Sequence, residues 1–226
     1  MDKLSFENHI ASRYDEELEQ IFSQLMAMGG KVEQQVQLAV KAILDSDSNI
    51  AERVIQGDKD VDRMEIRIDE DCVLVIARRQ PTASDLRLVI SVTRAVADLE
   101  RIGDEAEKIA KHALELIEHG PLMSGYTVVS QLGVSVTAML HNALDAFARF
   151  DADAAMRTID EDKQVDQEYK AALSELDTLM ASEPALLKQY LNLVWIVRSL
   201  ERIGDHAKNL CEQIVFVAKG KDIRHQ

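Results

Sequence analysis

Four pairs of acidic residues, each spaced four positions apart, are the residues in this chain whose types and spacing could do chemistry. They are Asp58 with Asp62, Glu100 with Asp104, Asp162 with Asp166, and Glu201 with Asp205. On a helix this spacing stacks both carboxylates on one face, with Cβ atoms roughly 5–6 Å apart. Carboxylates held this close repel unless a cation, a proton or an arginine compensates them. The pairs are therefore candidate metal ligands.

A single pair of this kind indicates little. The chain has 40 Asp and Glu among its 226 residues, so about seven such pairs are expected by chance. Most acidic pairs lie on solvated helix surface. The position of Asp58 argues against that interpretation, because it lies between Val54 and Val61, where an apolar stripe should continue. Asp162 has the same setting, and an unpaired charge at the edge of a packed stripe is costly.

The elements that carry these pairs are predicted to be helices. The chain has only 9 Gly and 3 Pro, a composition that favours long helices and argues against an all-β fold. Apolar residues recur with the i, i+3, i+4, i+7 spacing of amphipathic helices. This pattern predicts six helices, at residues 15–44, 50–79, 85–119, 128–150, 153–181 and 185–219.

The sequence contains an internal repeat. The pentapeptide Glu-Arg-Ile-Gly-Asp at residues 100–104 recurs letter for letter at 201–205, an offset of 101 residues. The motif Asp-Lys-x-Val-Asp at residues 58–62 recurs at 162–166, an offset of 104 residues. The two copies therefore stay almost in register, which indicates a duplicated structural unit.

A helix breaker separates the two copies. Gly120 and Pro121 are adjacent, and Gly125 follows soon after. We therefore predict an all-α fold of two tandem three-helix bundles, with one domain at residues 1–120 and the other at 121–226. Each domain should contain one helical hairpin that carries two of the acidic pairs.

The hairpins should bring the acidic pairs to one level. Consecutive helices joined by a short loop pack antiparallel, so residues equidistant from the loop centre lie opposite each other. In the first half both pairs are centred on Pro81, and in the second half both are centred between Glu183 and Pro184. Four carboxylates should therefore gather in each half.

Four anions at one level favour a bound metal. Two unit charges about 5 Å apart repel by roughly 3 kcal/mol at an effective dielectric near 20. Arg101 and Arg202 each follow their glutamate by one residue and are expected to point elsewhere on the helix. The predicted ligands are Asp58, Asp62, Glu100 and Asp104 at one site and Asp162, Asp166, Glu201 and Asp205 at the other. All-carboxylate sets select hard cations such as Mg²⁺, Mn²⁺, Ca²⁺ or Fe.

Histidine adds little to these sites. The chain contains no Glu-x-x-His, which argues against a ferritin-like di-iron oxidase. His141 is a possible extra ligand at the second site, although an ordinary half-buried histidine is the favoured interpretation. His206 adjoins Asp205 and is expected to face solvent.

Other function classes are disfavoured by the sequence. The net charge of −14 argues against binding to a nucleic-acid backbone. No nucleotide-binding loop, nucleophile elbow or zinc-protease motif occurs. No apolar run approaches the length of a membrane span. Two isolated cysteines, Cys72 and Cys211, fit a reduced cytoplasmic setting.

Several motifs resemble the PhoU family of phosphate-specific transport system accessory proteins. They are the repeated pentapeptides at 100–104 and 201–205, Gly57-Asp58, Met28-Gly29-Gly30, the RQPTASDLR segment at 79–87 and the DAFARFD segment at 145–151. The resemblance covers essentially the whole chain. It implies two tandem three-helix bundles whose E(D)xxxD motifs bind multinuclear metal clusters, with Mg, Mn, Fe or Zn as candidates. All eight motif carboxylates match, so the metal role carries to each.

The resemblance also implies a function and partners. Members of the family are cytoplasmic and lie at the inner membrane through protein partners. They regulate phosphate uptake and the phosphate-starvation response negatively, through the ATPase subunit of the phosphate ABC transporter and a sensor histidine kinase. A homodimer is expected. Nucleic-acid binding and direct membrane insertion are not expected.

An alternative is a metal-dependent phosphoesterase whose clustered metals activate water. That alternative lacks a general base beyond the metal ligands themselves, and a bundle of long helices implies no cleft. We therefore predict a non-enzymatic regulator.

Overall fold

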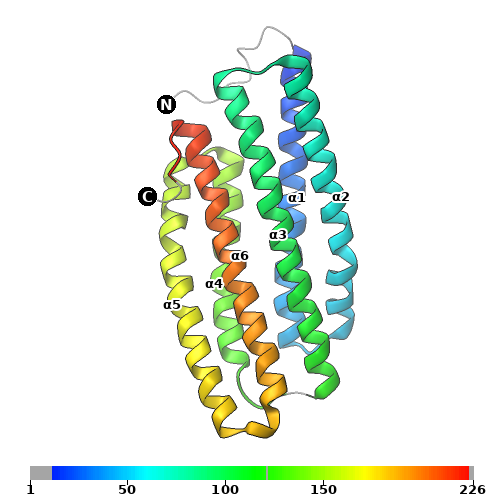
Figure 1. Cartoon of the computed structure of the whole chain (residues 1–226), viewed down its shortest axis with the longest axis vertical. Coiled ribbons are helices and arrows are strands. Elements are labelled where there is room, and N and C mark those ends of the chain that lie inside the picture. The colour runs from blue at the N-terminus through cyan, green and yellow to red at the C-terminus, as the bar shows by residue number, and fades with distance from the viewer. Residues whose placement is uncertain (1–11, 121, 224–226) are drawn as a thin grey trace.

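A computed structural model describes residues 12–120 and 122–223. In this part of the chain six long helices run back and forth along one axis (Figure 1). They are α1 (Ser12–Leu44), α2 (Ser48–Arg79), α3 (Ala83–His119), α4 (Tyr126–Arg149), α5 (Ala152–Ser182) and α6 (Leu187–Lys219). The described residues form no strand, and each predicted helix is present with its ends within a few positions. The all-α prediction is confirmed.

The helices form two three-helix bundles that lie side by side (Figure 1). Helices α1, α2 and α3 pack on one another, and so do α4, α5 and α6. The bundles meet chiefly where α3 packs along α6, and α1 also contacts α4. The two-bundle architecture is therefore confirmed. The domain boundary between residues 120 and 121 stays a prediction; Pro121 and the segments 1–11 and 224–226 lie outside the described residues.

One continuous hydrophobic core spans both bundles. Residues of both bundles contact each other in this core. Phe22 of α1 stacks on Phe150 and Phe147, with ring centroids 5.0 and 6.2 Å apart. Phe147 is only 2% exposed. Apolar surface on α1 is thus buried against α4 as well as against its own bundle, and this contact contributes to holding the two repeats together. None of the helices in the described part of the chain is apolar over the length that a bilayer requires.

Aspartate side chains cap two of the helices that carry acidic pairs. Asp47 precedes α2, and its carboxylate accepts hydrogen bonds from the backbone N–H groups of Asn49 and Ile50 at 2.9 and 3.2 Å. Asp151 caps α5 in the same way. The first amides of a helix have no partner within the helix, so such caps stabilise its start.

Replacing Asp47 by alanine should lower the free energy of unfolding by about 1 kcal/mol, because two backbone amides lose their acceptor. Urea denaturation followed by circular dichroism measures this change. The variants Asp47→Asn and Asp47→Ser keep a side-chain oxygen at the cap and should lose clearly less. Equal losses for all three substitutions would show that the cap is not the cause.

Short loops fix the register of the two hairpins. Residues 80–82 alone join α2 to α3. Gln80 adopts a left-handed conformation with φ 49° and donates its backbone N–H to the carbonyl of Ile76, which ends α2. In the second half, Glu183 and the 3-10 turn η2 (Pro184–Leu186) join α5 to α6. Both hairpins therefore turn at the predicted positions, and the residues on either side of each turn run antiparallel.

Candidate metal centre

The structure brings the four predicted acids of the first half together. We call Asp58 and Asp62 of α2 with Glu100 and Asp104 of α3 the first cluster. Gly103 shows how close the helices are, because a Cβ atom built on it would lie 3.1 Å from Asp58 Oδ1. A residue larger than glycine would press on this carboxylate. Hairpin register and a glycine together place Asp58 against the α3 acids.

Asp58 is the deepest member of the first cluster. Its side chain is 8% exposed, and its Oδ1 is buried without a hydrogen-bond partner among the described residues. Burial, followed by the carboxylates of Asp62 and Glu107, raises the pKa of Asp58 to about 6. Burial and Asp104 likewise raise the pKa of Glu100. Both effects disfavour the charged carboxylate and would be reversed by a nearby cation.

Arg101 covers the outer edge of the first cluster. Its Nε lies 3.3 Å from Glu100 Oε2 and its Nη1 lies 3.5 Å from Asp104 Oδ2. The expectation that Arg101 points elsewhere is wrong, because its long side chain folds back along the helix surface. The Arg101 side chain is 61% exposed, so screening by solvent weakens its compensation of the acids.

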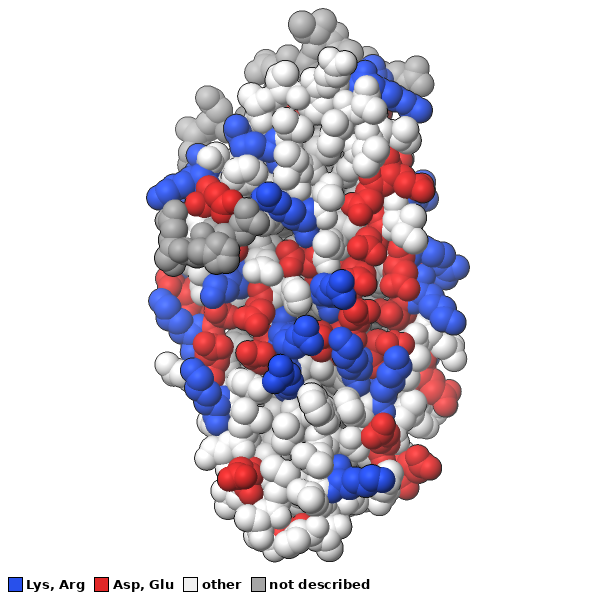
Figure 2. All heavy atoms as spheres, in the orientation of Figure 1, with Lys and Arg blue, Asp and Glu red and all other residues white. Residues whose placement is uncertain are grey.

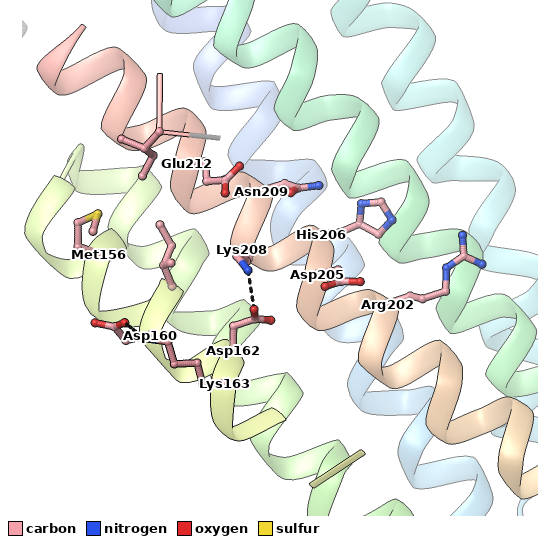
Figure 3. Close-up of a pocket in the computed structure, with 12 residues that line it drawn as sticks. Met156, Asp160, Asp162, Lys163, Arg202, Asp205, His206, Lys208, Asn209 and Glu212 are labelled. Atoms are coloured by element: carbon pink, nitrogen blue, oxygen red, sulfur yellow. Dashed lines mark hydrogen bonds and ion pairs between the residues drawn. The ribbon is translucent and has the colours of Figure 1, made fainter. Parts of the chain in front are cut away.

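The four predicted acids of the second half also face one another. We call Asp162 and Asp166 of α5 with Glu201 and Asp205 of α6 the second cluster. Burial raises the pKa of Glu201, followed by Asp205 and Asp166. Partial burial and Asp162 raise the pKa of Asp205, although much of its side chain is open to solvent. Asp162 and Asp205 line a solvent-open hollow of about 880 Å³ between α5 and α6 (Figure 3).

A lysine that sequence reasoning missed contacts the second cluster. Lys208 extends from α6 toward α5, and its Nζ donates a hydrogen bond to Asp162 Oδ2 at 2.7 Å (Figure 3). Asp162 is 7% exposed. The sequence feature that could have revealed this contact is the spacing of three residues between Asp205 and Lys208, which puts both on the same helix face.

The two histidines differ from expectation. His206 is not at the surface, because α6 packs on α3 and its ring Nδ1 lies 2.8 Å from Asp98 Oδ1 of that helix. His141 is not half-buried and does not reach the second cluster. Its exposed ring lies 2.9 Å from Glu33 of α1. Neither histidine is placed as a ligand of the predicted sites.

Arg202 likewise turns away from the second cluster, as the sequence predicts. Its Nη1 lies 2.9 Å from Oε1 of Glu105, a residue of α3 that is 3% exposed. This ion pair and the contact of His206 with Asp98 both link α3 to α6. These residues therefore join the two bundles, and Arg202 and His206 also border the hollow beside the second cluster.

The donor chemistry of the first cluster would suit a hard divalent cation. Its donors are carboxylates only, and the buried Oδ1 of Asp58 is a strong acceptor without a donor in the described part of the chain. Among the described residues, however, no group of three or more Asp, Glu, His or Cys side chains is placed so that it could hold a metal ion. A bound cation would replace carboxylate repulsion by coordination. The eight acids thus stay predicted ligands.

Comparison with known proteins gives consistent matches over the whole chain. The family model of the PhoU domain matches residues 25–113 and again 129–214. A phosphate-specific transport system accessory protein PhoU homolog of Pseudomonas aeruginosa is 50% identical over 100% of this chain and 93% of that protein. The phosphate-specific transport system accessory protein PhoU of Escherichia coli is 48% identical over the same shares.

Solved structures agree with these sequence matches. The crystal structure of PhoU from Pseudomonas aeruginosa has a TM-score of 0.90 and 51% identity, covering 92% of this chain and all of that one. The phosphate transport system regulatory protein PhoU from Streptococcus pneumoniae has a TM-score of 0.84 and 30% identity, covering 93% of this chain and 99% of that one. The duplicated domain, the six-helix fold and the full-length identity lead to one conclusion: the chain belongs to the PhoU family.

Proposed function

We propose that this protein is a non-enzymatic regulator of phosphate uptake and of phosphate-starvation signalling. It acts as a metal-binding helical adaptor on the phosphate ABC transporter and its sensor histidine kinase, and its effect is negative. The observation that carries this proposal is the full-length similarity to proteins named as accessory proteins of the phosphate-specific transport system. Those names describe accessory proteins and no enzyme, which supports a binding role.

The surface of α2 supports docking to protein partners. Ile66, Val73 and Leu74 lie on one face of α2 and are 58%, 64% and 42% exposed. Apolar side chains grouped on an otherwise charged helix are typical of protein contact surfaces. A partner protein or a second copy of this chain would bury them. The formal net charge of −14 disfavours attraction to anionic lipids, so protein contacts would hold this cytoplasmic protein at the inner membrane.

The partner proposal predicts selective binding. The purified protein should co-sediment with vesicles that contain the phosphate transporter, and it should bind the cytoplasmic part of the sensor kinase in solution. Protein-free vesicles rich in anionic lipid are the control and should retain little of it. The double variant Ile66→Glu and Val73→Glu should bind the transporter vesicles less, because the apolar face becomes charged. Strong binding to the protein-free vesicles would contradict the proposal.

The regulatory role predicts a phenotype. Cells that lack the protein should express phosphate-starvation genes even when phosphate is abundant, and the full chain supplied in trans should restore repression. A reporter fused to a starvation promoter measures this. Metal-loaded protein should show no turnover of a generic phosphomonoester above background, whereas turnover that disappears with the acidic clusters would favour the phosphoesterase alternative.

A further inference from the structure

The two repeats differ at the position one helical turn beyond the last acid of each cluster. With the offset of 101 residues between α3 and α6, Glu107 corresponds to Lys208 and Lys111 corresponds to Glu212. In α3 the residue one turn beyond the last acid is thus Glu107, which pairs with Lys111. In α6 the corresponding residue is the base Lys208, which pairs with Asp162. Glu107 lies three residues after Asp104 on α3 and therefore shares the helix face of the first cluster. The charge facing the cluster is therefore reversed between the repeats.

The deepest carboxylate of each cluster shows the consequence. Asp58 and Asp162 are equivalent in the repeat and are equally buried, at 8% and 7% exposed. Asp162 Oδ2 accepts a hydrogen bond from the Lys208 ammonium at 2.7 Å. Asp58 Oδ1 is buried without a donor in residues 12–120 and 122–223. The second cluster contains a cationic partner for its buried acid, and the first cluster does not.

The helix that lies outside the hairpin, α1 in the first bundle and α4 in the second, adds another difference. A Cβ atom on Gly103 would lie 3.6 Å from the amide oxygen of Gln35 in α1, and a Cβ atom on the equivalent Gly204 would lie 3.9 Å from the sulfur of Met139 in α4. Gln35 is 5% exposed, and neither polar atom of its amide has a partner among the described residues. An amide oxygen suits a hard cation, whereas a thioether does not.

The molecular surface shows the same contrast. In Figure 2, acidic side chains form a dense patch at mid-height over α2 and α3, whereas over α5 and α6 they alternate with Lys and Arg. Among the basic residues of the second half, Lys163, Arg202 and Lys208 line the hollow beside Asp162. Unbalanced negative charge is thus greater on the first bundle.

We propose that the two clusters are not equivalent: the first cluster, completed by Glu107 and Gln35, binds a hard divalent cation, whereas Lys208 supplies the positive charge of the second cluster. The second cluster therefore binds such a cation at least about tenfold more weakly, since the ammonium must first leave Asp162. This inference rests on the metal-binding part of the proposed function. It assigns roles to Gln35, Glu107 and Lys208 that the acidic motif alone does not.

Titration of the metal-stripped full chain with Mn²⁺, with free Mn²⁺ measured by electron paramagnetic resonance, tests the inequality. We expect a tight and a weak class of sites whose dissociation constants differ by about tenfold or more. Asp58→Asn should abolish the tight class, and Asp166→Asn, which removes one acid of the second cluster without touching the partner of Lys208, should leave it intact. Circular dichroism of each variant checks that it is folded. Loss of the tight class in Asp166→Asn but not in Asp58→Asn would overturn the assignment.

Exchange variants test the three assigned residues. Glu107→Lys should weaken the tight class by about tenfold or more, and Lys208→Glu should strengthen the weak class by a similar factor. Gln35→Met should weaken the tight class, because it installs the residue found in the second repeat. Glu115→Gln, a change on the exposed side of α3 away from the cluster, is the charge control and should alter neither class.

The melting temperature of metal-free protein tests the roles of Lys208 and Glu107 separately. In excess chelator, Lys208→Gln should lower the melting temperature, because Asp162 loses its partner, whereas Glu107→Gln should not lower it. Equal Mn²⁺ affinities at both clusters would overturn the inequality and leave the metal-binding adaptor intact. The complete absence of Mn²⁺ binding would overturn both this inference and the metal-binding part of the proposed function.

Discussion

Chelating divalent cations should lower the melting temperature of the wild-type protein, and a variant with amides at Asp58, Asp62, Glu100 and Asp104 should show little of this loss. A cation that binds only the folded protein stabilises it by mass action, by about 4 kcal/mol at a concentration of a thousand times its dissociation constant. For a chain of this size each kcal/mol corresponds to about 2–4 °C. The expected loss on chelation is therefore about 8–16 °C in a Mn²⁺-saturated sample.

Differential scanning calorimetry with Mn²⁺ and with excess chelator measures this effect. Glu115→Gln removes one exposed acid of α3 away from the first cluster and should keep the full response to chelation. If the first-cluster amide variant loses as much stability as the wild type when chelator is added, the first cluster is not the stabilising metal site.

The substitution Asp58→Asn should have the opposite effect in metal-free protein, raising the free energy of unfolding at pH 7. The pKa of Asp58 is raised from 3.8 to about 6, so ionisation of this buried carboxyl opposes folding. Because screening by solvent reduces the cost of ionisation, the gain should be at most about 3 kcal/mol. Urea denaturation at pH 7 with chelator present measures the gain, and an unchanged or lower stability of Asp58→Asn would contradict it.

The pH dependence of this effect has a definite sign. Because the folded pKa lies above the unfolded one, the stability contributed by protonated Asp58 is complete below about pH 3.8 and is lost as pH rises through about 6. The advantage of Asp58→Asn should therefore shrink from pH 7 toward pH 4. Asp60, two residues away, is the control. A hydrogen bond from Lys31 lowers the pKa of Asp60, so Asp60→Asn should not stabilise the protein at pH 7.

The sequence predicts those parts of the fold that depend on local pattern. Apolar periodicity predicts the helices, and Pro81 and Pro184 mark the two hairpin turns. Because a tight turn between straight helices determines which residues face each other, counting outward from Pro81 is enough to place Asp62 opposite Glu100. The repeat then transfers the same geometry to the second half.

Contacts between helices that are not consecutive could not be predicted in this way. Gln35 reaches Gly103 across the packing of α1 on α3, and His206 reaches Asp98 across the packing of α6 on α3. No loop length determines these registers. The role of Lys208 could not be predicted either, because a lysine one turn beyond an acidic motif usually lies on solvated helix surface. Only the packing of α5 against α6 places the buried Asp162 carboxylate within hydrogen-bond distance of it.

Whether the eight acids hold metal is decided by the metal content of protein purified without chelators, measured by elemental analysis. Wild type is compared with a folded variant that carries Asn or Gln at all eight acids, Asp58, Asp62, Glu100, Asp104, Asp162, Asp166, Glu201 and Asp205. We expect bound divalent metal in the wild type and close to none in the variant. Equal metal content in the two proteins would contradict this expectation, since the acids would then be a helix surface without a role in metal binding.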